Sequence, residues 1–176
     1  MRAFLALSIT YTPALDPLYK QLQIIPSIRT LQREQLHITL FFFRSISPKQ
    51  VERIIKIIDK KQQANALQKV TLKDPQVTCI PKEQSKIISL IFKKEQHLMT
   101  NYSKIRQELT FIPLDKRPYK PHMTLARIQE PLTQEQKEQV QNITISMSIT
   151  ILKMVLYKSQ LTPGGPVHTL LKEWEY

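Results

Sequence analysis

Apolar residues follow two periods along the chain, and together these periods predict a mixture of strands and helices. Continuous or alternating apolar runs rich in β-branched and aromatic residues indicate strands, whereas apolar residues three or four apart indicate helices. The strand pattern occurs at residues 3–9, 35–43, 69–72, 76–80, 86–92, 122–128 and 167–174, and once or twice within 143–157. The helix pattern occurs at residues 13–24, 48–61, 98–109 and 134–142.

Two of the helices carry clear start signals. Ser47 is a good N-cap, Pro48 suits a first helical position, and Gln50 completes a capping box. Thr133 and Gln136 repeat the capping box further along the chain. We therefore expect helices to begin directly after residues 47 and 133.

The order of these elements predicts an α+β fold. The 176 residues suffice for one sizeable domain or for two small lobes that share a core. Each half runs strand, helix, strand and helix, and no low-complexity linker separates the halves. We expect residues 1–176 to form one bilobal, pseudo-symmetric domain of intertwined lobes, with mostly antiparallel sheets flanked by helices. Gly164 and Gly165 should turn the chain before its last strand.

The pattern His-x-Thr-Leu occurs at the start of a predicted strand in each half. The first copy holds His37 and Thr39, and the second, with His122 and Thr124, lies 85 residues further along. Because strand side chains alternate between faces, each histidine shares a face with its threonine, and the residues between them face the core. If the lobes face each other, two imidazoles and two hydroxyls meet in a central cleft.

This constellation suits a phosphate ester. The hydroxyls can donate hydrogen bonds to phosphate oxygens, while one neutral histidine takes a proton from water and one protonated histidine gives a proton to the leaving oxygen. Histidine fits both tasks because its ordinary pKa lies near 6.5. The alternatives are two core histidines, a chance match, or a metal site. Two copies at matching places in the two halves favour a functional site over core histidines or a chance match. Neither motif contains a carboxylate or a cysteine, so a metal site is less favoured. We read His97 as a surface histidine, and neither it nor His168 has a similar setting.

Composition narrows the choice of partner. The formal net charge of +12 favours an anionic partner such as nucleic acid, although a lysine-rich solvated surface is the plainer explanation. With two glycines, the chain has neither a P-loop nor a Rossmann fingerprint, so side chains must hold any phosphate. The single cysteine, Cys79, fits a reducing, cytoplasmic compartment. We read the apolar N-terminus as a first strand and expect no membrane span.

The two motifs, "HITL" and "HMTL", resemble those of the two-histidine (2H) phosphoesterase superfamily. The stretch "RPYKPHMTLAR" at 117–127 resembles the bacterial and archaeal RNA 2′,3′-cyclic phosphodiesterases, also called 2′-5′ RNA ligase-like or LigT-like proteins. The opening "MRAFLAL" and the closing "LYKSQLTPGGPVHTLL" are similar to the same family. The resemblance thus covers nearly the whole chain, with two departures. "FFFRS" lacks a glycine that is usual after the first motif, and "KIISLIF" lacks a tryptophan-glycine pair.

The resemblance implies hydrolysis of a terminal 2′,3′-cyclic phosphate of RNA, or of a cyclic nucleotide, to a 2′-phosphate. It implies His37 as proton donor to the leaving 3′ oxygen and His122 as the base that activates water. Thr39, Thr124 and Arg127 would hold the phosphate, and neither a metal nor an organic cofactor is implied. We expect a monomer. Alternatives are a 2′-5′ RNA ligase, and a non-hydrolytic RNA-binding or nucleotide-binding module that uses the same cleft.

Strict alternation raises two difficulties for the site. It puts Arg127 on the face opposite His122, so a role for this arginine needs a bend or a strand end near Ala126. It also puts Phe41 and Phe43 on the face of the first histidine. Tyr119 could stack on a base or ribose, but packing against the edge of a lobe is an equal alternative.

Overall fold

The computed structural model describes residues 1–81, 84–163 and 165–176. Gly164, half of the predicted turn, lies outside the described residues, whereas Gly165 begins the last strand with a φ of +113°. The strands are β1 (Ala3–Ser8), β2 (Ile28–Thr30), β3 (His37–Phe43), β4 (Thr71–Lys73), β5 (Gln76–Ile80), β6 (Ile87–Ile91), β7 (His122–Ile128), β8 (Ser148–Thr150), β9 (Lys153–Thr162) and β10 (Gly165–Glu175). The α-helices are α1 (Asp16–Gln23), α2 (Pro48–Gln63), α3 (Gln96–Glu108) and α4 (Gln134–Gln141), and two 3₁₀ turns are η1 (Pro13–Leu15) and η2 (Arg33–Gln35).

One antiparallel sheet runs through the whole molecule. Its strand order is β10-β9-β1-β3-β7-β6-β5, with β2 paired to β7 beside the end of β3. The two His-x-Thr strands, β3 and β7, are therefore direct neighbours at the centre. The short strands β4 and β8 form a separate antiparallel pair. The expectation of a mostly antiparallel α+β fold is confirmed.

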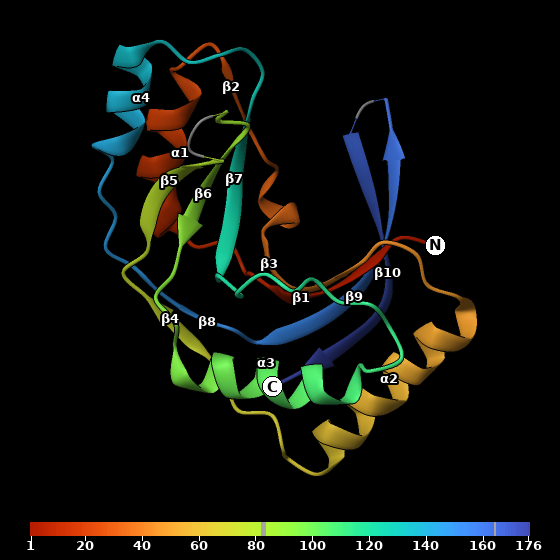
Figure 1. Ribbon diagram of the computed structural model, residues 1–176. Coiled ribbons are helices and arrows are strands. Elements are labelled where there is room, and N and C mark those ends of the chain that lie inside the picture. The colour runs from red at the N-terminus through yellow and green to blue at the C-terminus, as the bar shows by residue number, and fades with distance from the viewer. Residues whose placement is uncertain (82–83, 164) are drawn as a thin grey trace.

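Helices cover the two halves of this sheet separately (Figure 1). Helices α1 and α4 lie beside β2, β5, β6 and β7, whereas α2 and α3 lie beneath the half formed by β1, β3, β9 and β10. The hairpin of β9 and β10 extends past the other strands on the far side of the molecule from α1 and α4. In the part of the chain that the structure describes, no helix is long and apolar enough to cross a membrane.

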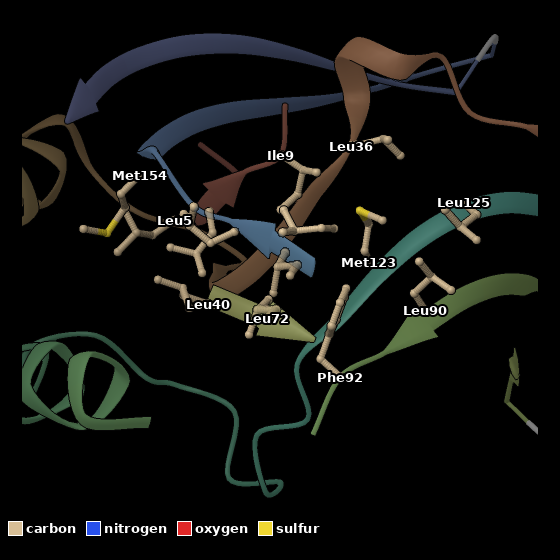
Figure 2. Close-up of a cluster of buried hydrophobic side chains, with 14 of the residues drawn as sticks. Leu5, Ile9, Leu36, Leu40, Leu72, Leu90, Phe92, Met123, Leu125 and Met154 are labelled. Atoms are coloured by element: carbon tan, nitrogen blue, oxygen red, sulfur yellow. The ribbon is translucent and has the colours of Figure 1, made fainter. Parts of the chain in front are cut away.

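The core follows the sheet from one half to the other. Figure 2 shows side chains from several strands meeting in it, with Leu5, Leu40, Met123 and Met154 from the central strands and Leu90 from β6. All five are at most 5% exposed. Because β3 and β7 contribute to this same apolar layer, burial fixes which of their faces remains available for chemistry.

Strands β3 and β7 carry β-bulges at matching places. Pairing shifts register between Thr39 and Phe41 on β3, and between Thr124 and Ala126 on β7, so the leucine of each motif is the extra residue. A bulge of this kind reverses the face on which the following side chains lie. Beyond Leu40 and Leu125, strict alternation therefore gives the wrong face.

The burial of the next residues shows the effect of each bulge. Phe41 and Phe43 are buried, while Phe42 is 39% exposed, so the prediction from strict alternation that Phe41 and Phe43 lie on the face of His37 is wrong. On β7, Ala126 is fully buried and Arg127 is exposed. Phe42 and Arg127 hold equivalent places after the two motifs.

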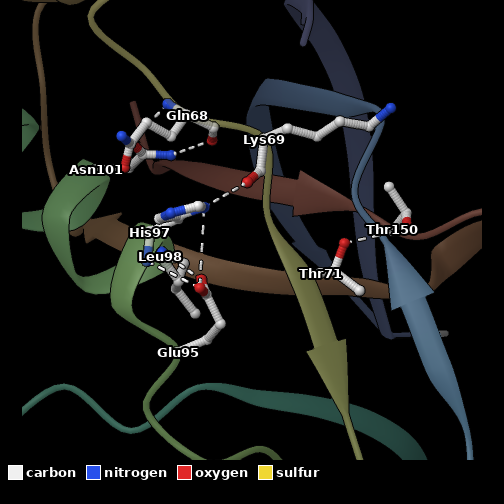
Figure 3. A network of polar contacts seen from close by, with 8 residues as sticks. All are labelled: Gln68, Lys69, Thr71, Glu95, His97, Leu98, Asn101 and Thr150. Carbon is white, nitrogen blue, oxygen red and sulfur yellow. Dashed lines mark hydrogen bonds and ion pairs between the residues drawn. The ribbon is translucent and has the colours of Figure 1, made fainter.

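A polar cluster at the start of α3 ties the helix to the segment before β4 (Figure 3). Asn101 is buried and binds both backbone groups of Gln68, accepting from its N–H at 2.9 Å and donating to its carbonyl at 2.7 Å. Glu95 caps the helix by accepting from the backbone N–H of His97, whose ring Nδ1 lies 3.2 Å from the carbonyl oxygen of Lys69. His97 is thus a half-exposed histidine on the surface, as predicted.

Candidate active site

The two motifs meet where β3 pairs with β7. Ile38 and Met123, the central residues of the motifs, are partners in this antiparallel contact, and both are fully buried. Because neighbouring side chains alternate, both motif histidines and both motif threonines lie on the other face of the sheet. We call this the motif face. The strands then diverge, and the contact of Ile38 with Met123 is their only paired position among the described residues.

Antiparallel geometry sets each histidine against the threonine of the other motif. One step out from the central contact, His37 comes opposite Thr124, and Thr39 comes opposite His122. All four side chains are partly exposed. Two imidazoles and two hydroxyls therefore share one small area of the motif face, arranged with a local two-fold symmetry.

A backbone carbonyl holds each imidazole in the same way. Nδ1 of His37 lies 2.7 Å from the carbonyl oxygen of Gln35, and Nδ1 of His122 lies 2.9 Å from the carbonyl oxygen of Lys120. A carbonyl oxygen can only accept, so Nδ1 carries the hydrogen and donates it. In the neutral ring this leaves Nε2 as the acceptor, and in the charged ring it leaves Nε2–H as a second donor. Each ring therefore presents Nε2 for proton transfer.

The surroundings of His37 favour its neutral form. Burial lowers the pKa of His37 below its ordinary value, and the charge of His122 lowers it further, while the hydrogen bond to Gln35 acts in the opposite direction. Electrostatic coupling between the two motif histidines agrees with their closeness on the sheet.

Two arginines lie on the strand of the second motif and its neighbour. The bulge at Leu125 brings Arg127 to the motif face, which supplies the bend that its predicted role requires. Arg29 on β2 is the direct cross-strand partner of Arg127, and both are exposed. Directly opposed residues project from the same face, so two guanidinium groups flank the second motif. Arg29 was missed in the sequence because β2 is only three residues long.

Tyr119 lies in an aromatic stack. Its ring is parallel to that of Tyr102 at 4.3 Å between centroids, and Tyr102 stacks in turn on Phe41 at 4.6 Å. Phe41 is on the buried side of β3, away from the motif face. Burial raises the pKa of Tyr119 and keeps its hydroxyl neutral. The packing alternative therefore accounts for Tyr119 at the edge of α3.

A pocket of about 240 Å³ opens beside the first motif. It is lined by Ser8, Glu34, Gln35, Leu36, His37, Tyr157, Pro166, Val167 and His168. Its walls are η2 on one side and the β9–β10 hairpin on the other. The second motif histidine, His122, does not line this pocket. Sequence reasoning had no means to single out His168, because its place beside His37 depends on the register of the hairpin.

Potential metal ligands do not gather in the described part of the chain. Residues 1–81, 84–163 and 165–176 hold no group of three or more His, Cys, Asp or Glu side chains that could bind a metal ion. Cys79 is partly buried on β5 and is not among the residues of the motif face.

Comparisons with known proteins agree with this arrangement. The profile of the family described as "LigT like Phosphoesterase" matches residues 92–168, which include the second motif and end at His168. An RNA 2′,3′-cyclic phosphodiesterase of Methanocaldococcus jannaschii is 24% identical over 180 residues, covering 99% of this chain and 100% of the relative. An RNA 2′,3′-cyclic phosphodiesterase of Methanothermobacter thermautotrophicus is 23% identical, covering 81% of this chain and 79% of the relative.

Solved structures share the fold along nearly the whole chain. A protein of Thermus thermophilus superimposes with a TM-score of 0.78 at 21% identity, covering 99% of this chain and 97% of the other. E. coli LigT complexed with 3′-AMP superimposes with a TM-score of 0.68 at 20% identity, with the same coverage. The shared fold agrees with the profile match at residues 92–168 and with the two relatives: the chain is similar to the LigT-like phosphoesterases.

Proposed function

We propose that this protein hydrolyses the terminal 2′,3′-cyclic phosphate of an RNA, or of a cyclic nucleotide, to a 2′-phosphate. The observation that carries the proposal is the contact between Ile38 and Met123, which sets both His-x-Thr motifs on one face with each Nε2 available. The archaeal relatives named RNA 2′,3′-cyclic phosphodiesterases support the choice of substrate. Both motifs come from one chain, so we propose that residues 1–176 act as one unit and as a monomer.

In the proposed reaction, each histidine moves one proton. Nε2 of neutral His122 takes a proton from a water molecule as its oxygen attacks phosphorus. Nε2–H of protonated His37 gives a proton to the 3′ oxygen as the bond from phosphorus to that oxygen breaks. The product carries a 2′-phosphate and a free 3′-hydroxyl. Proton exchange with solvent then returns both histidines to their starting forms.

We assign the acid role to His37 on the resemblance to the two-histidine phosphoesterases, which implies this histidine as the proton donor. A histidine whose pKa is lowered by burial gives up a proton more readily than an ordinary one once an anionic substrate has favoured its charged form. We propose that Thr39 and Thr124 donate hydrogen bonds to the non-bridging oxygens and that Arg127 offsets their negative charge; the shared face of the two motifs and the bulge before Arg127 support this. Arg29 is a further candidate for this charge, because it directly opposes Arg127.

The test is turnover of an oligoribonucleotide that ends in a 2′,3′-cyclic phosphate, with identification of the product isomer. We expect a 2′-phosphate and activity that persists in EDTA, because imidazoles carry both protons. His37→Ala and His122→Ala should each lower kcat by about 10²–10⁴-fold, the usual contribution of a general acid or base. His97→Ala is the matched control, since it removes an exposed histidine that lies on α3.

Each other outcome contradicts a specific part of the proposal. A 3′-phosphate product would reverse the leaving group, and full dependence on added metal would exclude the two-imidazole mechanism. Wild-type rates in both motif variants would exclude both acid–base roles. RNA binding without turnover would favour a binding module, and joined RNA products would favour a ligase.

A further inference from the structure

Ser89 on β6 is the direct cross-strand partner of Thr124, the threonine of the second motif. Directly opposed residues of an antiparallel pair project from the same face, with about 4.5–5.5 Å between their Cβ atoms. The Ser89 side chain therefore lies on the motif face, beside that of Thr124. Ser89 is fully buried, whereas Thr124 is partly exposed. A buried hydroxyl is thus the neighbour of a hydroxyl that a ligand can reach.

The hydroxyl of Ser89 is an unsatisfied polar group. Its Oγ is shielded from solvent and has no hydrogen-bond partner among the described residues. Thr78 on β5 faces Ser89 from the other side, and its hydroxyl does not satisfy this Oγ either. An unpaired buried hydroxyl lowers the stability of the folded protein, and an apolar residue of similar size avoids that cost. Folding alone therefore gives no reason for a hydroxyl at this position.

The first motif shows what packing requires at the equivalent place. Ala6 on β1 is the cross-strand partner of Thr39, as Ser89 is the partner of Thr124, and the strand register shifts directly beside Ala6 and Ser89. Both Ala6 and Ser89 are fully buried. A methyl group thus fills the position beside the first motif, so the fold accommodates an alanine there. The hydroxyl of Ser89 distinguishes the second motif from the first.

A second hydroxyl beside Thr124 has a chemical use when a phosphate binds. A hydroxyl donates one hydrogen and also accepts through its lone pairs. If Thr124 donates its hydrogen to a phosphate oxygen, its Oγ1 can accept a hydrogen from a neighbouring hydroxyl, and consecutive hydrogen bonds of this kind strengthen each other. Hydrogen bonds of active sites often become aligned only when the substrate binds, so the unpaired Oγ of Ser89 is compatible with this use.

We propose that Ser89 is a positioning residue, which donates a hydrogen bond to Thr124 and thereby orients the Thr124 hydroxyl toward the phosphate. The inference rests on the proposed function and deepens it, because it gives the two motif threonines different supports. Ser89 acts through Thr124 and does not itself touch the substrate. Its hydroxyl is unfavourable for folding and gains a partner when Thr124 binds an anion.

The test is a set of double-mutant cycles on kcat/KM for an oligoribonucleotide that ends in a 2′,3′-cyclic phosphate. Ser89→Ala should lower kcat/KM by about 2- to 13-fold, the effect of one hydrogen bond. In a Thr124→Val background the same change should have almost no effect, because the hydroxyl through which Ser89 acts is gone. In a Thr39→Val background, which is the matched control, Ser89→Ala should cause its full loss.

Stability measurements separate this role from a structural one. Ser89→Ala removes an unpaired buried hydroxyl, so its free energy of unfolding in urea should equal or exceed that of the wild type. A structural serine predicts the reverse, a less stable protein with unchanged kcat/KM. Thr78→Val removes the hydroxyl on the other side of Ser89 and should keep the wild-type kcat/KM. A loss in Thr78→Val equal to that in Ser89→Ala would overturn the pairing of Ser89 with Thr124.

The remaining outcomes also decide the proposal. Wild-type kcat/KM in Ser89→Ala would overturn it, and so would equal losses from this change in the wild-type and Thr124→Val backgrounds. If the wild type does not turn over the RNA, the proposed function fails, and the same cycles are measured on the binding of adenosine 2′,3′-cyclic phosphate. Coupling of Ser89 with Thr124 in that binding supports the positioning role, whereas independent effects or an absence of binding overturn it.

Discussion

His37 and His122 have matching backbone partners and different neighbours. Each donates from Nδ1 to the carbonyl oxygen two residues earlier. His37 packs on the buried Phe4 ring, whereas exposed Arg127 lies five residues after His122 on the same strand. The motif therefore supplies an oriented imidazole in each half, and the two imidazoles differ in what surrounds them.

The first prediction concerns the coupling of these two rings. Burial and the charge of His122 both lower the pKa of His37, so His122→Ala should raise that pKa toward its ordinary value while leaving it lowered by burial. NMR titration of the imidazole nitrogens in the unliganded protein measures the change. An unchanged or lower pKa of His37 in the variant would contradict electrostatic coupling across the strand pair.

The same shifts predict how stability depends on pH. The pKa values of His37 and His168 are lowered in the folded protein, so the unfolded chain binds more protons near and below pH 6.5. The free energy of unfolding should therefore fall as pH drops from about 7.5 to about 5. Urea unfolding measures this fall, which should be smaller in His168→Phe because phenylalanine does not titrate. An equal fall in both proteins would contradict the contribution of His168.

The sequence analysis identified the site residues that belong to a repeated motif, and it missed those whose position depends on the pairing of strands. The motif histidines stand out because the same tetrapeptide pattern recurs in each half of the chain. Arg29 and His168 carry no such signal, since their positions follow from which residues they face on β7 and β9. Register of this kind depends on contacts between distant segments, which a single sequence does not display.

At the scale of strands, the two bulges decide which side chains reach the motif face. Each bulge follows its motif threonine directly. The histidine and threonine of each motif therefore lie on the motif face as strict alternation predicts, whereas the residues after the bulge lie on the face opposite to the predicted one. The change brings Arg127 to the motif face and sends Phe41 into the core. A strand without the bulge would place this arginine among buried residues.

The opposed arginines on β2 and β7 give a prediction about the anion. Like charges directly opposite each other are unfavourable, and a bound phosphate offsets that repulsion. Arg127→Ala and Arg29→Ala should each raise KM for the cyclic phosphate, and the double variant should lose less than the product of the two single losses. Steady-state kinetics of the four proteins measures this coupling.

Two results would contradict a shared role for these arginines. Wild-type KM in Arg29→Ala would remove Arg29 from the site, and independent effects of the two changes would show that the arginines bind separate groups. Lys20→Ala is the control: it removes one positive charge, as the arginine variants do, but from the last turn of α1 and not from β2 or β7.

Element by element, the predicted boundaries were best where local chemistry sets them. The helices α2 and α4 begin directly after Ser47 and Thr133, whose capping boxes are both formed. The predicted strand at 35–43 begins two residues later, because residues 33–35 form a 3₁₀ turn. Strand β2 was missed because three residues carry too little pattern to predict.

At the scale of the whole molecule, one continuous sheet joins two halves through its two central strands. The chain also carries a formal net charge of +12, which favours an anionic ligand such as RNA over a neutral one. A longer RNA neutralises more of this charge than a cyclic mononucleotide does.

The predicted result is a difference in salt dependence. From about 50 to about 300 mM salt, kcat/KM for a short single-stranded RNA with a cyclic phosphate end should fall more steeply than kcat/KM for the cyclic mononucleotide. The slope for each substrate comes from a plot of log kcat/KM against log salt concentration. Equal slopes would show that the protein contacts only the terminal nucleotide, and that its excess charge has no part in binding.

The local two-fold symmetry about Ile38 and Met123 bears on the direction of the reaction. A reaction run backwards uses the same groups with acid and base exchanged, and each motif holds an imidazole with Nε2 available for either role. With an RNA hydroxyl in place of water beside His122, the proposed forward displacement would join two RNA chains instead of hydrolysing one. The nucleophile beside His122 thus decides which product forms, and the exchange of roles between the two motifs decides whether that product is cleaved again.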